Sequence, residues 1–225
     1  MRGRLALMLA TTTTDLQTPV LLVALPQVVD PFFNKSVVLL IHHDDEGSLG
    51  LIVNRPTGIS VGDILEGMEI PWSGDAASLT HFGGPVQPQL GTVLFTPDGG
   101  GNGLLAGSGS GNGSSDDGGE GPSAGLQAAS EVAPGVALTQ HVADLGRPAA
   151  SPPSRFRLFL GYAGWGEGQL LEEIVRNDWL VAPVDADLIF SANPDQAWAS
   201  ALRSVGVDPE TLPSWSPAGF DDDAN

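Results

Sequence analysis

The sequence contains no cysteine. This excludes disulfide bonds, thiolate nucleophiles and cysteine-ligated metals. Basic residues are also scarce, because nine lysines and arginines stand against 27 aspartates and glutamates, which gives a formal net charge of -18. Such an acidic surface repels phosphate backbones, so we expect no nucleic-acid binding unless a local basic patch forms. Only Arg155 and Arg157 make a small basic cluster.

The chain also lacks a long apolar segment. No run approaches the roughly 20 apolar residues of a membrane-spanning helix. The amino terminus, MRGRLALMLA, contains an apolar run that is shorter than the roughly seven to fifteen residues of a secretory signal. We therefore expect a cytoplasmic protein that makes no contact with a membrane.

Hydrophobic residues make up 41% of the 225 residues, which suffices for the core of one domain. The stretch 99–130 is rich in glycine and serine and has little to bury, so it cannot offset its own ordering entropy. We predict a flexible N-terminal extension at 1–15, a single domain at 16–215 that this disordered insertion interrupts, and an acidic tail at 216–225.

Apolar runs bounded by glycine, proline or acidic turns predict the strands, and amphipathic spacing predicts the helices. The strands are expected at 19–25, 35–42, 49–54, 91–95, 134–139, 155–161, 179–182 and 187–190. The helices are expected at 60–68, 169–177 and 194–205. This order lacks a regular alternation of strand and helix. The predicted class is therefore α+β: a single compact domain with a mixed, largely antiparallel sheet and flanking helices.

Four distinctive segments combine apolar strands with glycine-rich turns. They are DPFFNKSVVLLIHHDDEGSLGLIVNRP (Asp30–Pro56), GGPVQP (Gly83–Pro88), LGYAGWGEGQLLEEI (Leu160–Ile174) and WLVAP (Trp179–Pro183). Their residues and their order resemble the YqgE/AlgH family of small bacterial proteins. The resemblance implies one α+β domain with a coiled, bifurcated sheet. The family is commonly described as transcriptional regulators or as uncharacterised proteins, and the resemblance carries over no catalytic residue and no cofactor.

The segment Gly58–Gly62 reads GISVG and matches the G-x-S-x-G pattern of serine hydrolases. Pro56 disrupts the sharp strand-to-helix turn that such a nucleophile needs. Ser60 also has a local role, because its hydroxyl can cap the following helix while Asp63 occupies position N3. A hydrolase that uses Ser60 is therefore an alternative, for which spacing identifies no histidine or acid partner.

The run His42-His43-Asp44-Asp45 contains possible metal ligands. Adjacent residues of a strand point to opposite faces, so His42 and His43 cannot easily share one ion. His43 could share an ion with Asp45 or with His81. A solvated hairpin turn explains the same residues, so we assign no metal ligand, and a metal-dependent enzyme that uses His43 stays an alternative.

The segment Gly161–Gly168, GYAGWGEG, is predicted to link a strand to a helix. Its glycines let the backbone approach another backbone or a ligand closely. We favour close packing anchored by Tyr162 and Trp165, with a small-ligand or peptide pocket beside the turn as the alternative.

The preferred hypothesis is a non-enzymatic regulatory or binding protein that acts through an unknown protein or small-ligand partner. Its predicted surface comprises Asn54, Arg55, Gly83, Gly84, Pro85, Tyr162, Trp165 and Gln169. The first alternative is the enzyme that uses Ser60 or His43. The second is a DNA-binding transcriptional regulator, which requires a basic face built from Arg55, Arg155, Arg157 and Arg203.

Overall fold

The structure is a computed structural model that describes residues 16–97, 130–190 and 193–213. The expected N-terminal extension, the expected acidic tail and nearly all of the expected insertion lie outside the described residues. The last residue of that insertion, Ser130, begins strand β7.

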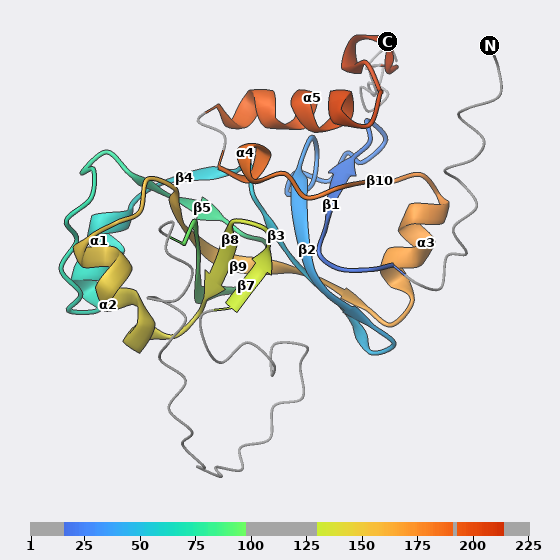
Figure 1. Ribbon diagram of the computed structural model, residues 1–225. Coiled ribbons are helices and arrows are strands. Elements are labelled where there is room, and N and C mark those ends of the chain that lie inside the picture. Colours follow the sequence, from blue (N-terminus) through green and yellow to red (C-terminus); the bar gives the residue numbers. More distant parts are fainter. Residues whose placement is uncertain (1–15, 98–129, 191–192, 214–225) are drawn as a thin grey trace, which may run out of the picture.

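One curled sheet forms the body of the protein (Figure 1). The strand order is β10-β1-β2-β3-β9-β6-β8-β7, and β5 joins β9 beside this path while β4 pairs with β5. Among the described pairings only β5 with β9 is parallel. The predicted α+β class with a mixed, largely antiparallel sheet is confirmed. The strands are β1 Val20–Ala24, β2 Val37–Asp44, β3 Gly47–Ile52, β4 Pro56–Ser60, β5 Leu79–Phe82, β6 Val86–Phe95, β7 Ser130–Ala133, β8 Val136–Thr139, β9 Phe156–Gly166 and β10 Trp179–Ala182.

Strand β9 is where the sheet divides. The C-terminal half of β9 pairs with β3, so that Ala163 lies opposite Gly50. On its N-terminal half β9 pairs with β5, so that Phe159 lies opposite His81. Strand β6 also pairs with β9. The hairpin β2–β3 and the small β4–β5 ribbon therefore meet on one central strand.

The continuous apolar runs of β1 and β2 reflect burial on both faces of the sheet. Leu21 and Leu39 lie opposite each other in the register and belong to one core cluster. Leu22 and Val38 also lie opposite each other, but they belong to the cluster on the other face. A strand with only one buried face would instead alternate apolar and polar residues.

Helices cover both faces and one end of this sheet (Figure 1). On one face, α3 buries Leu170 in the cluster that contains Leu22. On the other, α4 and α5 bury Ile189 and Trp198 in the cluster that contains Leu21. None of the helices in the described ranges is long and apolar enough to cross a membrane. The helices are α1 Val61–Gly67, α2 Val142–Ala150, α3 Gln169–Val175, α4 Ala186–Ile189, α5 Pro194–Ser204 and the 3-10 helix η1 Pro209–Thr211.

The strand predicted at 187–190 is wrong, because this segment is helical. The side chain of Asp185 accepts a hydrogen bond from the backbone N–H of Asp187 over 2.8 Å and so caps the amino terminus of α4. The backbone N–H of Ile189 donates to the carbonyl of Asp185 over 3.1 Å. A local cap of this kind outweighs the strand preference of a few apolar residues.

The glycine-rich link between strand and helix is also shorter than predicted. Strand β9 continues to Gly166, because its last residues pair with β3. Only Glu167 and Gly168 then separate the strand from α3. In addition, the Pro56 segment forms the short strand β4, which is not among the predicted strands, since proline is tolerated at the first position of an edge strand.

Candidate functional site

The loop between β1 and β2 contains the DPFFNK motif and is tied down at both ends. One carboxylate oxygen of Asp30 accepts hydrogen bonds from the backbone N–H groups of Phe32 and Phe33, over 2.8 and 3.2 Å. The side-chain amide of Asn34 donates to the carbonyl of Val28 over 3.0 Å. The loop therefore has a defined backbone conformation although its tip is exposed.

Asn54 and Arg55 attach this loop to the end of β3. The buried Asn54 accepts a hydrogen bond from the Val37 backbone N–H over 2.8 Å and donates to the Lys35 carbonyl over 3.0 Å. The Arg55 guanidinium donates to the Asn34 carbonyl. These two predicted site residues thus position the DPFFNK loop.

The two phenylalanines of the loop point in different directions. Phe33 packs inward, with its ring centroid 6.2 Å from that of Trp165 and 5.8 Å from that of Trp179. Phe32 packs outward and stacks on Phe82 at 5.6 Å, and 46% of its surface stays exposed. We use the name Phe32 surface for Phe32 and Phe82 and for the groups that hold the loop. These groups are Asp30 and the contact between Asn34 and Arg55.

The glycines after Phe82 allow two backbones to cross. A Cβ atom on Gly83 would lie 2.2 Å from the carbonyl oxygen of Gly161, and one on Gly84 would lie 2.1 Å from the carbonyl carbon of Tyr162. The backbone of Gly83 also forms two hydrogen bonds at this crossing. Its N–H donates to the carbonyl of Leu160, and its carbonyl accepts from the N–H of Ile52, each over 2.8 Å. These glycines are therefore required by packing, and Pro85 follows them on the surface.

Trp165 and Gln169 meet at a residue that the sequence analysis does not select, Glu173. Trp165 and Trp179 donate their indole N–H groups to one carboxylate oxygen of Glu173, over 2.9 and 2.8 Å. Gln169 donates to the other oxygen over 2.9 Å and accepts from the Gly166 backbone over 3.1 Å. This network fastens α3 to the sheet. The spacing of four residues between Gln169 and Glu173 is the sequence signal that indicates such a pair.

The eight predicted site residues do not share one surface. Trp165 lies opposite Ser48 near the start of β3, whereas Asn54 follows the end of that strand. At about 3.3 Å per strand residue, these two positions are roughly 20 Å apart. Asn54, Arg55 and the glycine turn belong with the Phe32 surface, while Trp165 and Gln169 belong with Glu173. Tyr162 is buried in the cluster on the other face of the sheet.

Ser60 has no base among the residues that the structure describes. Ser60 occupies the N-cap position of α1 as predicted, but its side chain makes no capping hydrogen bond, so the predicted cap interaction is wrong. Ser60 lies opposite Leu79, two residues before His81. Neither ring nitrogen of His81 has a hydrogen-bond partner among the described residues, so Ser60 and His81 form no nucleophile–base pair.

The histidines of the β2–β3 hairpin bond to their immediate neighbours. His42 and Asp44 share a hydrogen bond of 2.7 Å between Nε2 and Oδ2, and His43 shares one of 2.8 Å with Ser48. The bond to His42 is the main reason why the pKa of Asp44 is lowered. Within the described ranges, no three histidine, aspartate or glutamate side chains are grouped so that they could hold a metal ion.

His81 has one aromatic and one charged neighbour. Its ring centroid is 5.5 Å from that of Phe159, and the charge of Arg157 is close by. Burial, and then Arg157, lower the pKa of His81 to about 3, although the Leu79 backbone opposes this shift slightly. Arg157 donates to the Val53 carbonyl over 2.8 Å, and burial lowers its pKa to about 10.

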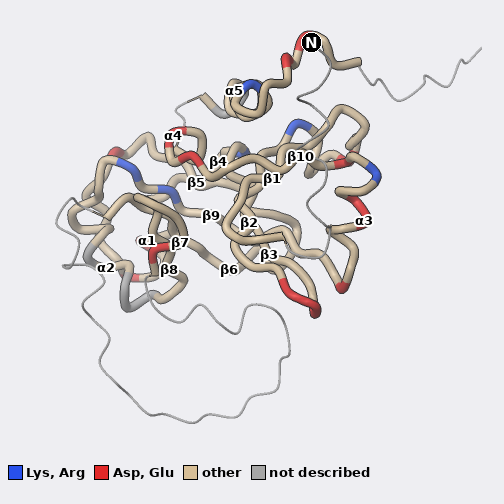
Figure 2. Tube along the Cα trace, turned by 45° about the vertical axis from the view of Figure 1, so that its right-hand side comes forward, with Lys and Arg blue, Asp and Glu red and all other residues tan. Residues whose placement is uncertain are grey.

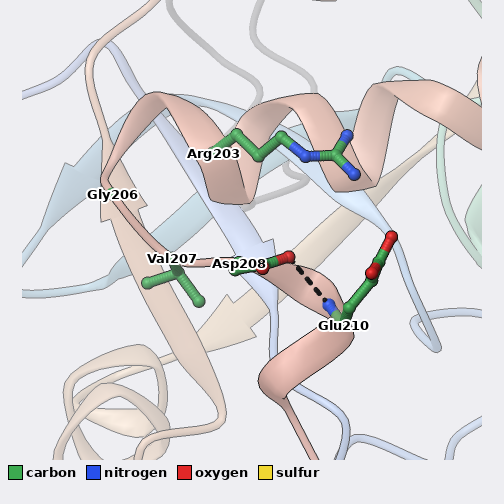
Figure 3. Close-up of a pocket in the computed structure, with 5 residues that line it drawn as sticks. All are labelled: Arg203, Gly206, Val207, Asp208 and Glu210. Atoms are coloured by element: carbon green, nitrogen blue, oxygen red, sulfur yellow. Dashed lines mark hydrogen bonds between the residues drawn. The ribbon is translucent and has the colours of Figure 1, made fainter.

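A depression of about 440 Å³ lies between the end of α5 and η1 (Figure 3). Asp208 accepts a hydrogen bond there from the backbone N–H of Glu210 over 3.1 Å. The lining residues are Arg203, Gly206, Val207, Asp208 and Glu210. None of the eight predicted site residues lines this depression.

Comparison with known proteins places these motifs in one family. The family described as AlgH-like matches residues 21–210. A UPF0301 protein of Ruegeria pomeroyi is 36% identical over 193 residues, which cover 84% of this chain and 91% of the relative. A UPF0301 protein of Cupriavidus metallidurans is 35% identical over 191 residues, which cover 83% of this chain and 87% of the relative.

Solved structures agree with this assignment. The solution structure of the AlgH protein from Pseudomonas aeruginosa has a TM-score of 0.62 and 27% identity, and the match covers 91% of this chain and all of that one. A crystal structure of a Corynebacterium diphtheriae protein has a TM-score of 0.64 at 22% identity, covers 92% of this chain and 95% of that one, and supports the fold. The chain therefore belongs to the AlgH-like family, and its resemblance to YqgE/AlgH proteins is confirmed.

Proposed function

We propose that this protein is a non-enzymatic binding protein that acts through a protein partner, and that the partner contacts the Phe32 surface. The observation that carries this proposal is the combination of an exposed aromatic ring with a fixed backbone. Phe32 is 46% exposed, yet Asp30 bonds its backbone N–H and Phe82 supports its ring.

Such a residue is suited to anchor a partner. Binding hot spots are rich in large, rigid side chains, and a group held in its bound conformation loses little entropy on association. A stacked phenylalanine on a hydrogen-bonded loop meets both conditions. An aromatic ring that served only the fold would be expected to pack inward and not to stay exposed. Phe33 packs in this way.

The competing functions have less support. The enzyme alternatives require a base for Ser60 or a ligand group around His43, and the contacts described above supply neither. A DNA-binding regulator has to overcome a formal net charge of -18. A cytoplasmic location is part of the proposal and rests on the sequence alone.

The test places a photo-crosslinking phenylalanine analogue at position 32 and, as the matched control, at Met68. Met68 is 39% exposed but follows α1, which belongs to another part of the molecule. We expect a discrete crosslinked partner from position 32 in native cells and none of the same mass from position 68. The partner is identified by mass spectrometry and its affinity is measured with purified components.

The proposal also predicts the effect of truncating the side chain. Phe32→Ala should weaken binding of that partner at least tenfold, whereas Met68→Ala should leave it unchanged. Equal crosslinking from both positions, or full affinity of the Phe32→Ala protein, would show that the Phe32 surface is not the contact.

A further inference from the structure

A buried polar side chain, His81, lies on the face of β5 opposite to Phe82. His81 and Phe82 are consecutive strand residues and therefore point to opposite faces. His81 is only 7% exposed, and neither ring nitrogen makes a hydrogen bond of normal geometry among the described residues, although the Leu79 backbone is close enough to raise its pKa. Buried polar groups in folded proteins nearly always have a partner, so an unpartnered imidazole needs an explanation.

One arginine, Arg157, lies near this imidazole, and Arg155 lies two residues before Arg157 along the chain. Arg157 lies two residues before Phe159, the β9 partner of His81, and alternation along the strand puts Arg157 and Phe159 on one face. The bond from Arg157 to the Val53 carbonyl holds its guanidinium near the end of β3. Arg155 immediately precedes β9 and pairs with Asp187 of α4.

Charge is unevenly distributed over the fold. Figure 2 shows basic residues where β9 begins, with acidic residues of α4 beside them, and a further group of acidic residues at the turn between β2 and β3. A chain with a formal net charge of -18 therefore keeps two arginines close together in sequence, of which Arg155 is paired with Asp187. At physiological salt the Debye length is about 8 Å, so the distant acidic residues are largely screened at this position.

We propose that Arg155, Arg157 and His81 form a binding site for a small oxyanion, which is a phosphate or a carboxylate group. The guanidinium groups supply positive charge and directed N–H donors, which match the geometry of both anions. The neutral imidazole supplies one further N–H donor, so the anion provides the partner that this ring lacks.

Two side chains beside the proposed site are partly exposed to solvent. The Arg155 side chain is 41% exposed and Leu79, two residues before His81, is 43% exposed, so an anion can reach this part of the surface from solvent. Asp187 opposes the ligand because its carboxylate pairs with Arg155. Its side chain is 77% exposed, however, and exposed ion pairs are weak enough to be displaced. We therefore expect half-saturation at millimolar rather than micromolar anion.

The experiment titrates the full-length labelled protein with sodium phosphate, using sodium chloride at equal ionic strength as the reference. NMR signals of the His81 ring and of the Arg157 side-chain N–H should shift and saturate with phosphate, and the exposed His141 should not follow them. A parallel titration with sodium acetate distinguishes a phosphate ligand from a carboxylate ligand. A site for carboxylate groups should respond to acetate and to phosphate at similar concentrations, whereas a site for phosphate should not.

Two variants connect the response to the proposed residues. Arg155→Gln should raise the half-saturating concentration at least fivefold, while Arg203→Gln, which removes an arginine of the α5 depression, should leave it unchanged. The proposal is overturned if neither phosphate nor acetate gives a saturable shift at His81. It is also overturned if both variants bind the anion as the parent protein does.

Discussion

Trp165 and Trp179 share a single hydrogen-bond acceptor, the Oε2 atom of Glu173. Their rings meet nearly edge to face, with centroids 5.9 Å apart and an angle of 81° between the planes. Both rings are buried, whereas the Glu173 side chain that accepts their bonds is only half-buried. The two most distinctive tryptophans of the family motifs are thus joined by a residue of α3.

Glu173→Ala should destabilise the protein by about 2–6 kcal/mol. The substitution leaves two buried indole N–H groups without an acceptor, and each such group costs about 1–3 kcal/mol. Urea unfolding followed by tryptophan fluorescence measures this loss. Glu172→Ala is the control, because Glu172 is exposed on the same helix, and it should change stability by about 0.5 kcal/mol or less.

Asn54→Ala should destabilise the protein by about 1–3 kcal/mol, because it removes the acceptor for the buried Val37 N–H and the donor to Lys35. The Val37 amide should exchange with solvent faster than in the parent protein. Asn54→Asp keeps an acceptor for Val37, but it buries a carboxylate oxygen against the Lys35 carbonyl, so it should destabilise the protein at least as much as the alanine variant. Unchanged exchange at Val37 in the alanine variant would contradict this role.

Gly83→Ala should destabilise the protein by about 3 kcal/mol or more. The added methyl group would lie 2.2 Å from the backbone oxygen of Gly161, which cannot move without disturbing β9. Gly58→Ala is the matched control, since a methyl group there meets nothing within 4 Å. Thermal unfolding of both variants compares them directly, and similar melting temperatures would rule out the backbone crossing.

His81 should make stability fall as the pH decreases from 6.5 towards 3. The folded state keeps the imidazole neutral down to a pKa of about 3, whereas the unfolded chain takes up the proton near pH 6.5. The unfolded state therefore binds more protons in this window, and the folded state loses up to about 1.4 kcal/mol per pH unit. Above pH 6.5 this effect is absent, because the ring is neutral in both states.

The measurement compares urea unfolding of the parent protein and of His81→Gln at pH 7.5 and pH 5. Carboxylates titrate alike in both proteins, so the difference between them isolates His81. The parent protein should lose up to about 2 kcal/mol more than the variant between these pH values. Identical pH dependence in the two proteins would show that His81 is accessible to protons in the folded state.

The sequence by itself determined the elements whose apolar pattern is continuous or sharply bounded. The strands around Leu22 and Val38 and the hairpin that follows are predicted close to their observed bounds, because burial on both faces leaves an uninterrupted apolar run. The family motifs likewise indicated the α+β fold. By contrast, α2 is not predicted, since Gly146 and Pro148 are helix breakers that packing against the sheet overrides.

Only the tertiary structure decided what the motif residues do. Asn54 and Trp165 look like parts of one surface in the sequence, but the antiparallel register of β3 with β9 places them at different ends of a strand. Glu173 is not selected from the sequence, and it becomes the acceptor of two indoles only because β9 and β10 bring both tryptophans to α3. The physical reason is that local periodicity records which face of a segment is buried, whereas pairing between remote segments depends on a register that no local pattern contains.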